Sequence, residues 1–188
     1  MYRDNTLIPS EAVRLCGLGI LMFGRRRYAE LAREVRHFTS RIAGPSLDLL
    51  GTSVELLRFE GLVRAVDGDD DALLEITDQG RREFESLMRS GIRSPGSDVS
   101  KLVIALKVRF LHLLDAEARR EQIELMVEMC ENELARLTDL HASHAGDTGV
   151  LPAWLDHDVA QAKARLAWYR DLADAKLSAI STQLSAKV

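Results

Sequence analysis

The sequence predicts a mainly α-helical protein that carries one small β-hairpin. Three observations favour this fold class. Apolar residues recur at helical spacing over most of the chain, as Cys16 and Ile20 do near its start. The pair Asp67-Gly68 separates two short apolar-rich runs, which is a strong short-range signal of a hairpin. A stretch rich in Gly, Pro and Ser at residues 91–98 separates two helical halves.

The first half is expected to begin with three helices. Ser10 is expected to cap an apolar, buried helix that ends near Gly24. A second helix covers residues 28–37, and the run FTSRIAGP is expected to break the helical pattern. A third helix covers residues 46–60 and carries an apolar stripe of Leu47, Leu50, Val54 and Leu57.

A two-stranded ribbon and a fourth helix are expected next. The runs LVRAV and ALLEIT form the strands on either side of Asp67-Gly68. Thr77 then caps the helix DQGRREFESLMRS. The ribbon tip is acidic, because it holds Asp67, Asp69, Asp70 and Asp71.

The second half is expected to consist of long helices. The run KLVIALKVRFLHLLD is apolar on nearly every face, so it must be covered all round. Amphipathic helices follow over residues 117–140 and 155–184, separated by a polar loop. Three such helices present more apolar surface than they can cover among themselves, and a symmetric homodimer is the usual solution.

The order helix, helix, helix, ribbon, helix is that of a winged helix-turn-helix, in which a helical pair binds DNA and the ribbon is the wing. We therefore expect a DNA-binding domain at residues 1–90, a linker at 91–98, and a helical dimerisation and effector domain at 99–188. The expected partners are a double-stranded DNA operator and a second copy of the chain. A dimer would place its recognition helices in major grooves one or two turns apart.

Composition is compatible with this interpretation. An apolar fraction of 46% and a charged fraction of 29% are typical of a globular protein. The net charge of −4 excludes a chain that is basic throughout, but residues 22–47 hold six arginines and two glutamates. Such a local patch suits DNA, because phosphate contacts are local.

The remaining composition points to a cytoplasmic protein. No apolar run approaches the roughly 20 residues of a membrane span, and we see no secretory leader. Cys16 and Cys130 lie far apart in apolar helical patterns, which fits a reducing compartment and gives no paired metal motif.

Candidate DNA contacts come from the turns and from the outer face of the third helix. Arginine turns flank the DNA backbone in helix-turn-helix domains, and Ser and Thr can bond phosphates or bases. The alternatives are a solvated cationic loop and an ordinary amphipathic helix. The expected contact residues are Arg25, Arg26, Arg27, Tyr28, Thr39, Arg41, Ser46, Asp48, Thr52, Ser53 and Arg64.

The acidic ribbon tip is not expected to hold phosphate, because clustered like charge would be repelled there. We expect it to stand away from the duplex or to limit nonspecific binding. Phosphate contact then falls to Arg64 at the base of the ribbon and to the arginine turns.

No catalytic motif is evident, and no cofactor is expected. His141 and His144 have the spacing His-x-x-His with Asp158 downstream, which could hold a metal, but solvated loop histidines explain them better. There is no short-range Ser/His/Asp or Cys/His pairing and no phosphate-binding glycine loop. We therefore expect no enzyme and no metal site.

Several stretches resemble the PadR-like transcriptional regulators. GILMFGRRRYAELAREV is similar to the family's first turn and Tyr-led second helix. SVELLRFEGLV resembles the end of the family's recognition helix. ITDQGRREFESL resembles the family's strand followed by Thr-x-x-Gly and a helix. ARLAWYRDLADAKL resembles its Trp-containing last helix. The acidic ribbon tip departs from the family, whose wing tip is often basic.

The resemblance implies a homodimeric regulator, usually a repressor. Some relatives dissociate from DNA when they bind a small aromatic ligand near the dimer interface. Residues assigned to this effector or dimer interface are Phe110, Trp154, Trp168 and Tyr169. Both tryptophans could instead anchor a core or interface. The alternative function is a degenerate winged helix that binds a protein partner without binding DNA.

Overall fold

The computed structural model describes residues 6–44, 53–68, 71–93 and 96–174 and confirms a mainly helical fold with a small antiparallel sheet. It forms two compact units, Met1–Leu114 and Asp115–Val188. The helices are α1 (Pro9–Met22), α2 (Tyr28–Ala43), α3 (Ser53–Phe59), α4 (Asp78–Met88), α5 (Asp98–Phe110), the 3-10 helix η1 (Leu111–Leu113), α6 (Ala116–Ser143) and α7 (Leu151–Asp174); the strands are β1 (Arg26–Arg27), β2 (Val63–Ala65) and β3 (Leu73–Ile76).

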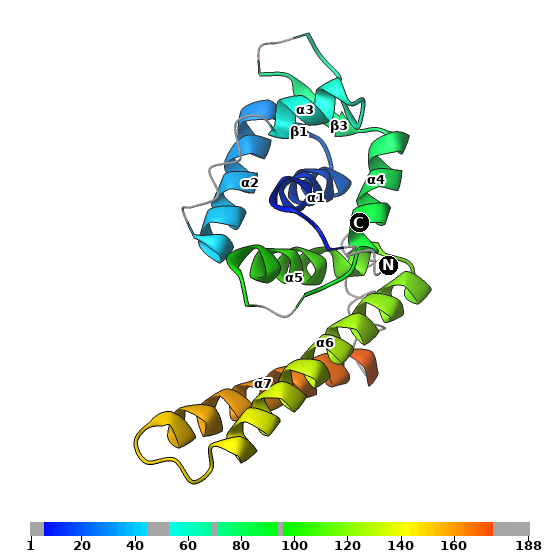
Figure 1. Ribbon diagram of the computed structural model, residues 1–188. Coiled ribbons are helices and arrows are strands. Elements are labelled where there is room, and N and C mark those ends of the chain that lie inside the picture. Colours follow the sequence, from blue (N-terminus) through cyan, green and yellow to red (C-terminus); the bar gives the residue numbers. More distant parts are fainter. Residues whose placement is uncertain (1–5, 45–52, 69–70, 94–95, 175–188) are drawn as a thin grey trace, which may run out of the picture. The chain divides into compact units, whose positions relative to one another are not determined.

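Helix α1 is the core of the first unit, as its apolar sequence predicted. Figure 1 shows it nearly end-on, ringed by α2, α3, α4 and α5, and it contacts all four. Nine of its residues are buried. Arg14, also on α1, forms ion pairs with Glu60 at 2.8 Å and with Glu83 at 3.0 Å. These pairs join α1 to the end of α3 and to α4.

The start of α1 differs from the expected Ser10 cap. Pro9 occupies the first helical position, because its fixed φ already suits a helix, and Ile8 is the N-cap. The Glu11 carboxylate accepts the Ile8 N–H at 2.9 Å, so an acidic side chain supplies the missing acceptor. Ser10 lies inside the first turn.

Helix α2 is longer than expected, because the run FTSRIA is helical and the predicted break after His37 is wrong. Thr39 and Ala43 continue the buried stripe of Leu31 and Val35 at four-residue steps. The helix ends at Gly44, whose φ of 76° favours glycine.

The ribbon is confirmed, and it gains a third strand. Strand β2 pairs with β3 in the register Val63↔Ile76, Arg64↔Glu75 and Ala65↔Leu74. The two-residue strand β1 pairs with the other edge of β3, so the order is β1-β3-β2. Two residues carry no periodicity, so sequence alone offered no signal for β1.

The step from sheet to α4 is closed by the Thr77 cap, as predicted. The Thr77 hydroxyl accepts the Gly80 N–H at 3.1 Å. The same hydroxyl also lies 2.8 Å from the Gly61 carbonyl, to which it can donate. Thr77 therefore joins the α3–β2 turn to the start of α4.

Helix α5 belongs to the first unit and packs on α1 and α2. The division between units therefore follows Leu114, whereas the expected linker was residues 91–98. The second unit is a helical hairpin of α6 and α7 with Met126, Cys130 and Leu166 in its seam. Among the described residues, no helix is long and apolar enough to cross a membrane.

Candidate nucleic-acid interface

One carboxylate holds two arginines on an exposed face of the sheet. Glu75 lies 2.7 Å from Arg25 Nε and 2.6 Å from Arg64 Nε, and each arginine bonds a different carboxylate oxygen. Glu75 stands opposite Arg64 across the β2–β3 ladder, and Arg25 directly precedes β1. The hydrogen bonds from Arg64 and then Arg25 lower the pKa of Glu75, so it stays ionised.

This Arg25–Glu75–Arg64 cluster remains available to a ligand. The side chains of Arg25 and Arg64 are 55% and 71% exposed, whereas that of Glu75 is only 17% exposed. A guanidinium has five N–H donors, and the cluster leaves several of them unused by Glu75. Two oriented guanidinium groups with one net positive charge suit a phosphodiester backbone.

Arg27 holds the ribbon closed instead of standing free in a turn. Its Nη1 donates to Asp67 Oδ2 at 3.0 Å and to the Asp71 carbonyl at 2.9 Å. The other oxygen of Asp67 accepts the Leu73 N–H at 2.7 Å, which bridges the ribbon's base. The Asp71 carboxylate accepts the Ala29 N–H at 2.9 Å in the first turn of α2.

Two of the four tip aspartates therefore have local structural partners. Asp67 and Asp71 fix the ribbon to β1 and to α2 and satisfy backbone N–H groups there. This accounts for part of the acidity by local bonding. Asp69 and Asp70 lie outside the described residues.

Arg26 and Tyr28 also have intramolecular partners. Arg26 donates to the Arg25 carbonyl at 2.8 Å and lies 3.9 Å from Glu34, which also pairs with Arg109 at 2.6 Å. Burial, followed by the charge and hydrogen bond of Glu55, raises the pKa of Tyr28. Tyr28 thus links α2 to α3.

The other residues expected to contact DNA differ in their exposure, and some lie outside the described residues. Thr39 is a correction: it is fully buried, and its hydroxyl donates to the Val35 carbonyl at 2.9 Å, so it cannot reach DNA. Arg41 is exposed in the last turn of α2. Ser53 is the first residue of α3. Ser46, Asp48 and Thr52 lie outside the described residues.

The described part of α3 exposes a cation that the sequence analysis missed. Val54 and Leu57 are buried, while Glu55, Leu56, Arg58 and Phe59 are exposed. Glu55, Arg58 and Phe59 have i, i+3, i+4 spacing on the side away from the apolar stripe, and that spacing could have identified Arg58.

The residues assigned to an effector or dimer interface belong to two units: Phe110 lies in the first unit, and Trp154, Trp168 and Tyr169 lie in the second. Phe110 is a correction: it is fully buried in the first unit, with its ring centroid 5.9 Å from that of Phe84. Tyr169 is also buried, which raises its pKa to about 12, and Trp168 meets it edge-on at 5.0 Å. Trp154 and Trp168 are about half exposed.

The two histidines of the His-x-x-His spacing each pair with one carboxylate. His141 lies 2.8 Å from Asp156, and His144 lies 2.9 Å from Asp147. Within the described ranges, no group of three or more His, Cys, Asp or Glu side chains could hold a metal ion.

Comparison with known families gives one match over most of the chain. The family model described as "Putative AphA-like transcriptional regulator" matches residues 2–173. No curated protein matches the sequence. The match covers both compact units. This match supports a role in regulating transcription. Membership of the PadR-like family in particular stays a prediction.

Proposed function

Since the chain belongs to the AphA-like family of transcriptional regulators, we propose that it regulates transcription by binding double-stranded DNA as a homodimer, most simply as a repressor. The observation that carries this proposal is the Arg25–Glu75–Arg64 cluster, in which one carboxylate orients two exposed guanidinium groups on the sheet. Arg58 on the outer face of α3 supplies a third cation from the expected recognition helix.

The double variant Arg25→Ala/Arg64→Ala is expected to weaken binding to all DNA sequences by about 10- to 100-fold at moderate salt. Two lost phosphate contacts should also reduce the slope of log K against log salt by about 2. Electrophoretic mobility shifts on the DNA upstream of the gene, repeated at rising salt, measure both quantities.

The matched control for this experiment is Arg82→Ala/Arg120→Ala, which removes the same charge from exposed positions on α4 and α6. Equal losses in both double variants would show that only net charge matters, and the cluster assignment would be wrong. Absence of binding by the wild type even at low salt would favour the alternative function, a winged helix that binds a protein partner.

Glu75→Gln is expected to tighten nonspecific DNA binding several-fold. The substitution keeps the shape of the side chain but raises the charge of the cluster from +1 to +2, so the salt slope should steepen by up to about 1. Fluorescence anisotropy with random-sequence duplexes tests this. Unchanged binding would contradict phosphate contact at Arg25 and Arg64, whereas weaker binding would show that orientation of both arginines by the two Glu75 oxygens outweighs the gain in charge.

Asp69→Asn/Asp70→Asn tests whether the acidic tip limits nonspecific binding, while Asp67 and Asp71 keep their partners. We expect tighter binding to random-sequence DNA with little change in thermal stability, because like charge beside phosphate is removed. Weaker binding would instead assign these side chains a direct contribution to the interface.

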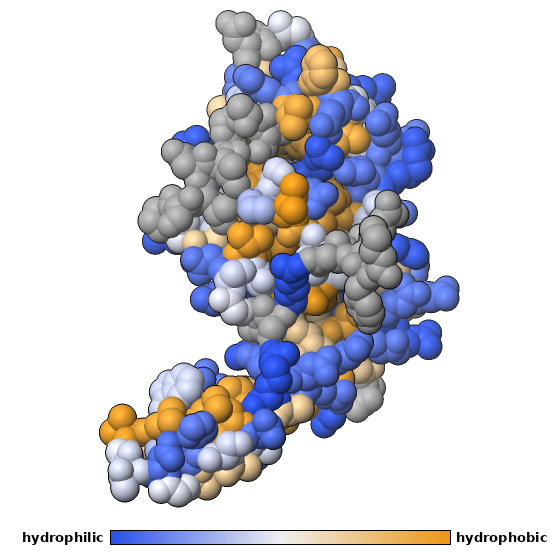
Figure 2. Space-filling model, viewed as in Figure 1, coloured by the Kyte–Doolittle hydropathy of each residue, from blue (hydrophilic) through white to orange (hydrophobic). Residues whose placement is uncertain are grey.

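The homodimer is proposed to form through the second unit. A hairpin of two helices leaves large apolar side chains uncovered, and Figure 2 shows such side chains at the loop end of the α6–α7 hairpin. A second copy would cover them. The exposed apolar residues of the hairpin are Leu140, Val150, Leu151, Trp154 and Trp168. Sedimentation equilibrium tests the stoichiometry.

A small aromatic ligand near Trp154 or Trp168 remains part of the proposal, and fluorescence quenching tests it.

A further inference from the structure

A groove of about 310 Å³ lies in the second unit, between α6 and the C-terminal part of α7. This volume is at the lower end of the roughly 300–1,000 Å³ typical of small-molecule pockets. Apolar and charged side chains lie side by side in its lining, which consists of Ile123, Val127, Ala173, Glu124, Glu128, Glu131 and Arg170.

Two carboxylates of this α6–α7 groove are uncompensated. Glu131 pairs with Arg170 at 2.6 Å, so these two charges neutralise each other. Glu124 and Glu128 are exposed, and neither forms an ion pair with another described residue. They stand at i and i+4 on one helix, where the Cβ atoms of such neighbours are about 5–6 Å apart. One cationic group can therefore contact both carboxylates.

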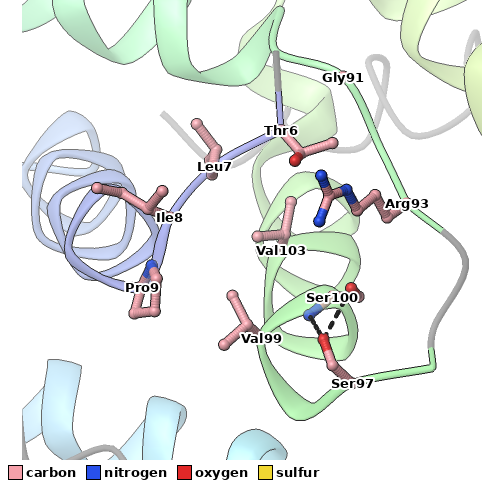
Figure 3. Close-up of a pocket in the computed structure, with 10 residues that line it drawn as sticks. All are labelled: Thr6, Leu7, Ile8, Pro9, Gly91, Arg93, Ser97, Val99, Ser100 and Val103. Carbon is pink, nitrogen blue, oxygen red and sulfur yellow. Dashed lines mark hydrogen bonds between the residues drawn. The ribbon is translucent and has the colours of Figure 1, made fainter. Parts of the chain in front are cut away.

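A cavity of similar size in the first unit, shown in Figure 3, differs in this respect. Its walls are the segment Thr6–Pro9, the connection between α4 and α5, and the first turns of α5. The one charged residue of its described lining, Arg93, already interacts with another part of the chain. The carboxylates of the α6–α7 groove, in contrast, are open to a ligand.

We propose that the α6–α7 groove binds a small aliphatic primary amine as its ammonium ion. An ammonium group has three N–H donors, so it can donate to Glu124 and Glu128 at once. The hydrocarbon chain lies against Ile123, Val127 and Ala173, where it is partly removed from water. An aliphatic chain suits the groove better than an aromatic ring, because its described lining holds no aromatic side chain for stacking.

A second copy of the chain suits this groove less well than an amine does. The groove lies beside a stripe of exposed glutamates on α6, none of which pairs with another described residue: Glu117, Glu121, Glu124 and Glu128. Across a two-fold axis the same stripe of two copies would meet, and the like charges would repel each other. An ammonium ion relieves this repulsion instead.

NMR titration of the full chain without DNA tests the proposal, so its outcome is separate from that of DNA binding. The probes are hexylammonium chloride, methylammonium chloride and hexanol at constant pH and ionic strength; the last two are the charged and the apolar parts of the first. Hexylammonium is expected to bind about 10-fold or more tightly than either, because only it combines charge with a buried chain. It should shift the amide signals of residues 123–131 and 170–173. Shifts no larger than those caused by methylammonium would overturn the proposal.

Matched variants on α6 separate the groove from the rest of the acidic stripe. Glu124→Gln/Glu128→Gln is expected to weaken hexylammonium binding about 5-fold or more, because both acceptors of the ammonium group lose their charge. Glu117→Gln/Glu121→Gln removes the same charge at the same spacing outside the groove and should bind as the wild type does. Circular dichroism without ligand checks that each variant is folded. Equal losses in both double variants would show attraction to net charge alone and would overturn the assignment.

Sedimentation equilibrium with and without hexylammonium distinguishes the amine from a second copy as the occupant of the groove. The stoichiometry is expected to stay the same, since the ligand fills a groove that no partner covers. Dissociation of a dimer by hexylammonium would show that a second copy covers the groove and would contradict the proposal.

Discussion

Gly80→Ala is expected to destabilise the first unit by about 3 kcal/mol or more, because no rearrangement of a single side chain can make room. A Cβ at position 80 would lie 2.1 Å from the Leu62 carbonyl oxygen and 2.8 Å from Ile76 Cγ1. The Leu62 carbonyl cannot move freely, since it accepts the Thr77 N–H at 3.0 Å. The clash therefore pushes β2 away from α4 or breaks the Thr77 cap.

Hydrogen exchange of the α1 amides measures this loss directly. Tryptophan fluorescence would follow the wrong part of the chain, because Trp154 and Trp168 both lie in the second unit. The matched control is Gly96→Ala, where a Cβ would meet nothing within 4 Å. Equal protection in both variants would show that β2 can shift without cost and would contradict the packing at position 80.

The stability of the first unit is expected to rise between pH 7 and pH 10 because of Lys107. This side chain is fully buried on α5, and its Nζ donates to the Met88 carbonyl at 2.5 Å and to the Ser90 carbonyl at 2.8 Å. Burial lowers the pKa of Lys107 from 10.5 to about 7. The unfolded chain therefore binds more protons than the folded chain in this window, and stability increases with pH.

The expected size of this effect is about 3–4 kcal/mol, since each unit of pKa difference is worth about 1.4 kcal/mol. Below pH 7 Lys107 is protonated in both states, so its contribution is constant and unfavourable there. Lys107→Met removes the titration while keeping an unbranched chain in the site. Urea unfolding of both proteins by circular dichroism from pH 6 to pH 10 gives the difference in unfolding free energy.

The wild type should gain stability relative to Lys107→Met as the pH rises, and other titrating groups cancel in the difference. The matched control is Lys101→Met on the same helix, where the side chain is 54% exposed and pairs with Asp98. A difference that stays flat from pH 7 to pH 10 would show that Lys107 is charged throughout, held by the two carbonyls.

The sequence by itself determined the elements whose signals are local. The apolar pattern of α1, the Asp-Gly hairpin and the Thr77 cap all depend on residues within a few positions of one another, and each has the expected form. The Thr-x-x-Gly pattern was also visible, but only as a resemblance. Its physical reason, the Leu62 carbonyl packed on Gly80, joins residues that are far apart in the chain.

Only the tertiary structure decided how the charges are used. Sequence placed Arg25 and Arg27 together in one basic turn, yet Arg25 shares Glu75 with Arg64 whereas Arg27 binds the acidic ribbon. It also placed Thr39 on DNA, although the longer α2 turns that residue into the core. A local pattern fixes which face of an element is polar. Which partner a charge meets depends on long-range packing, which a short stretch of sequence does not encode.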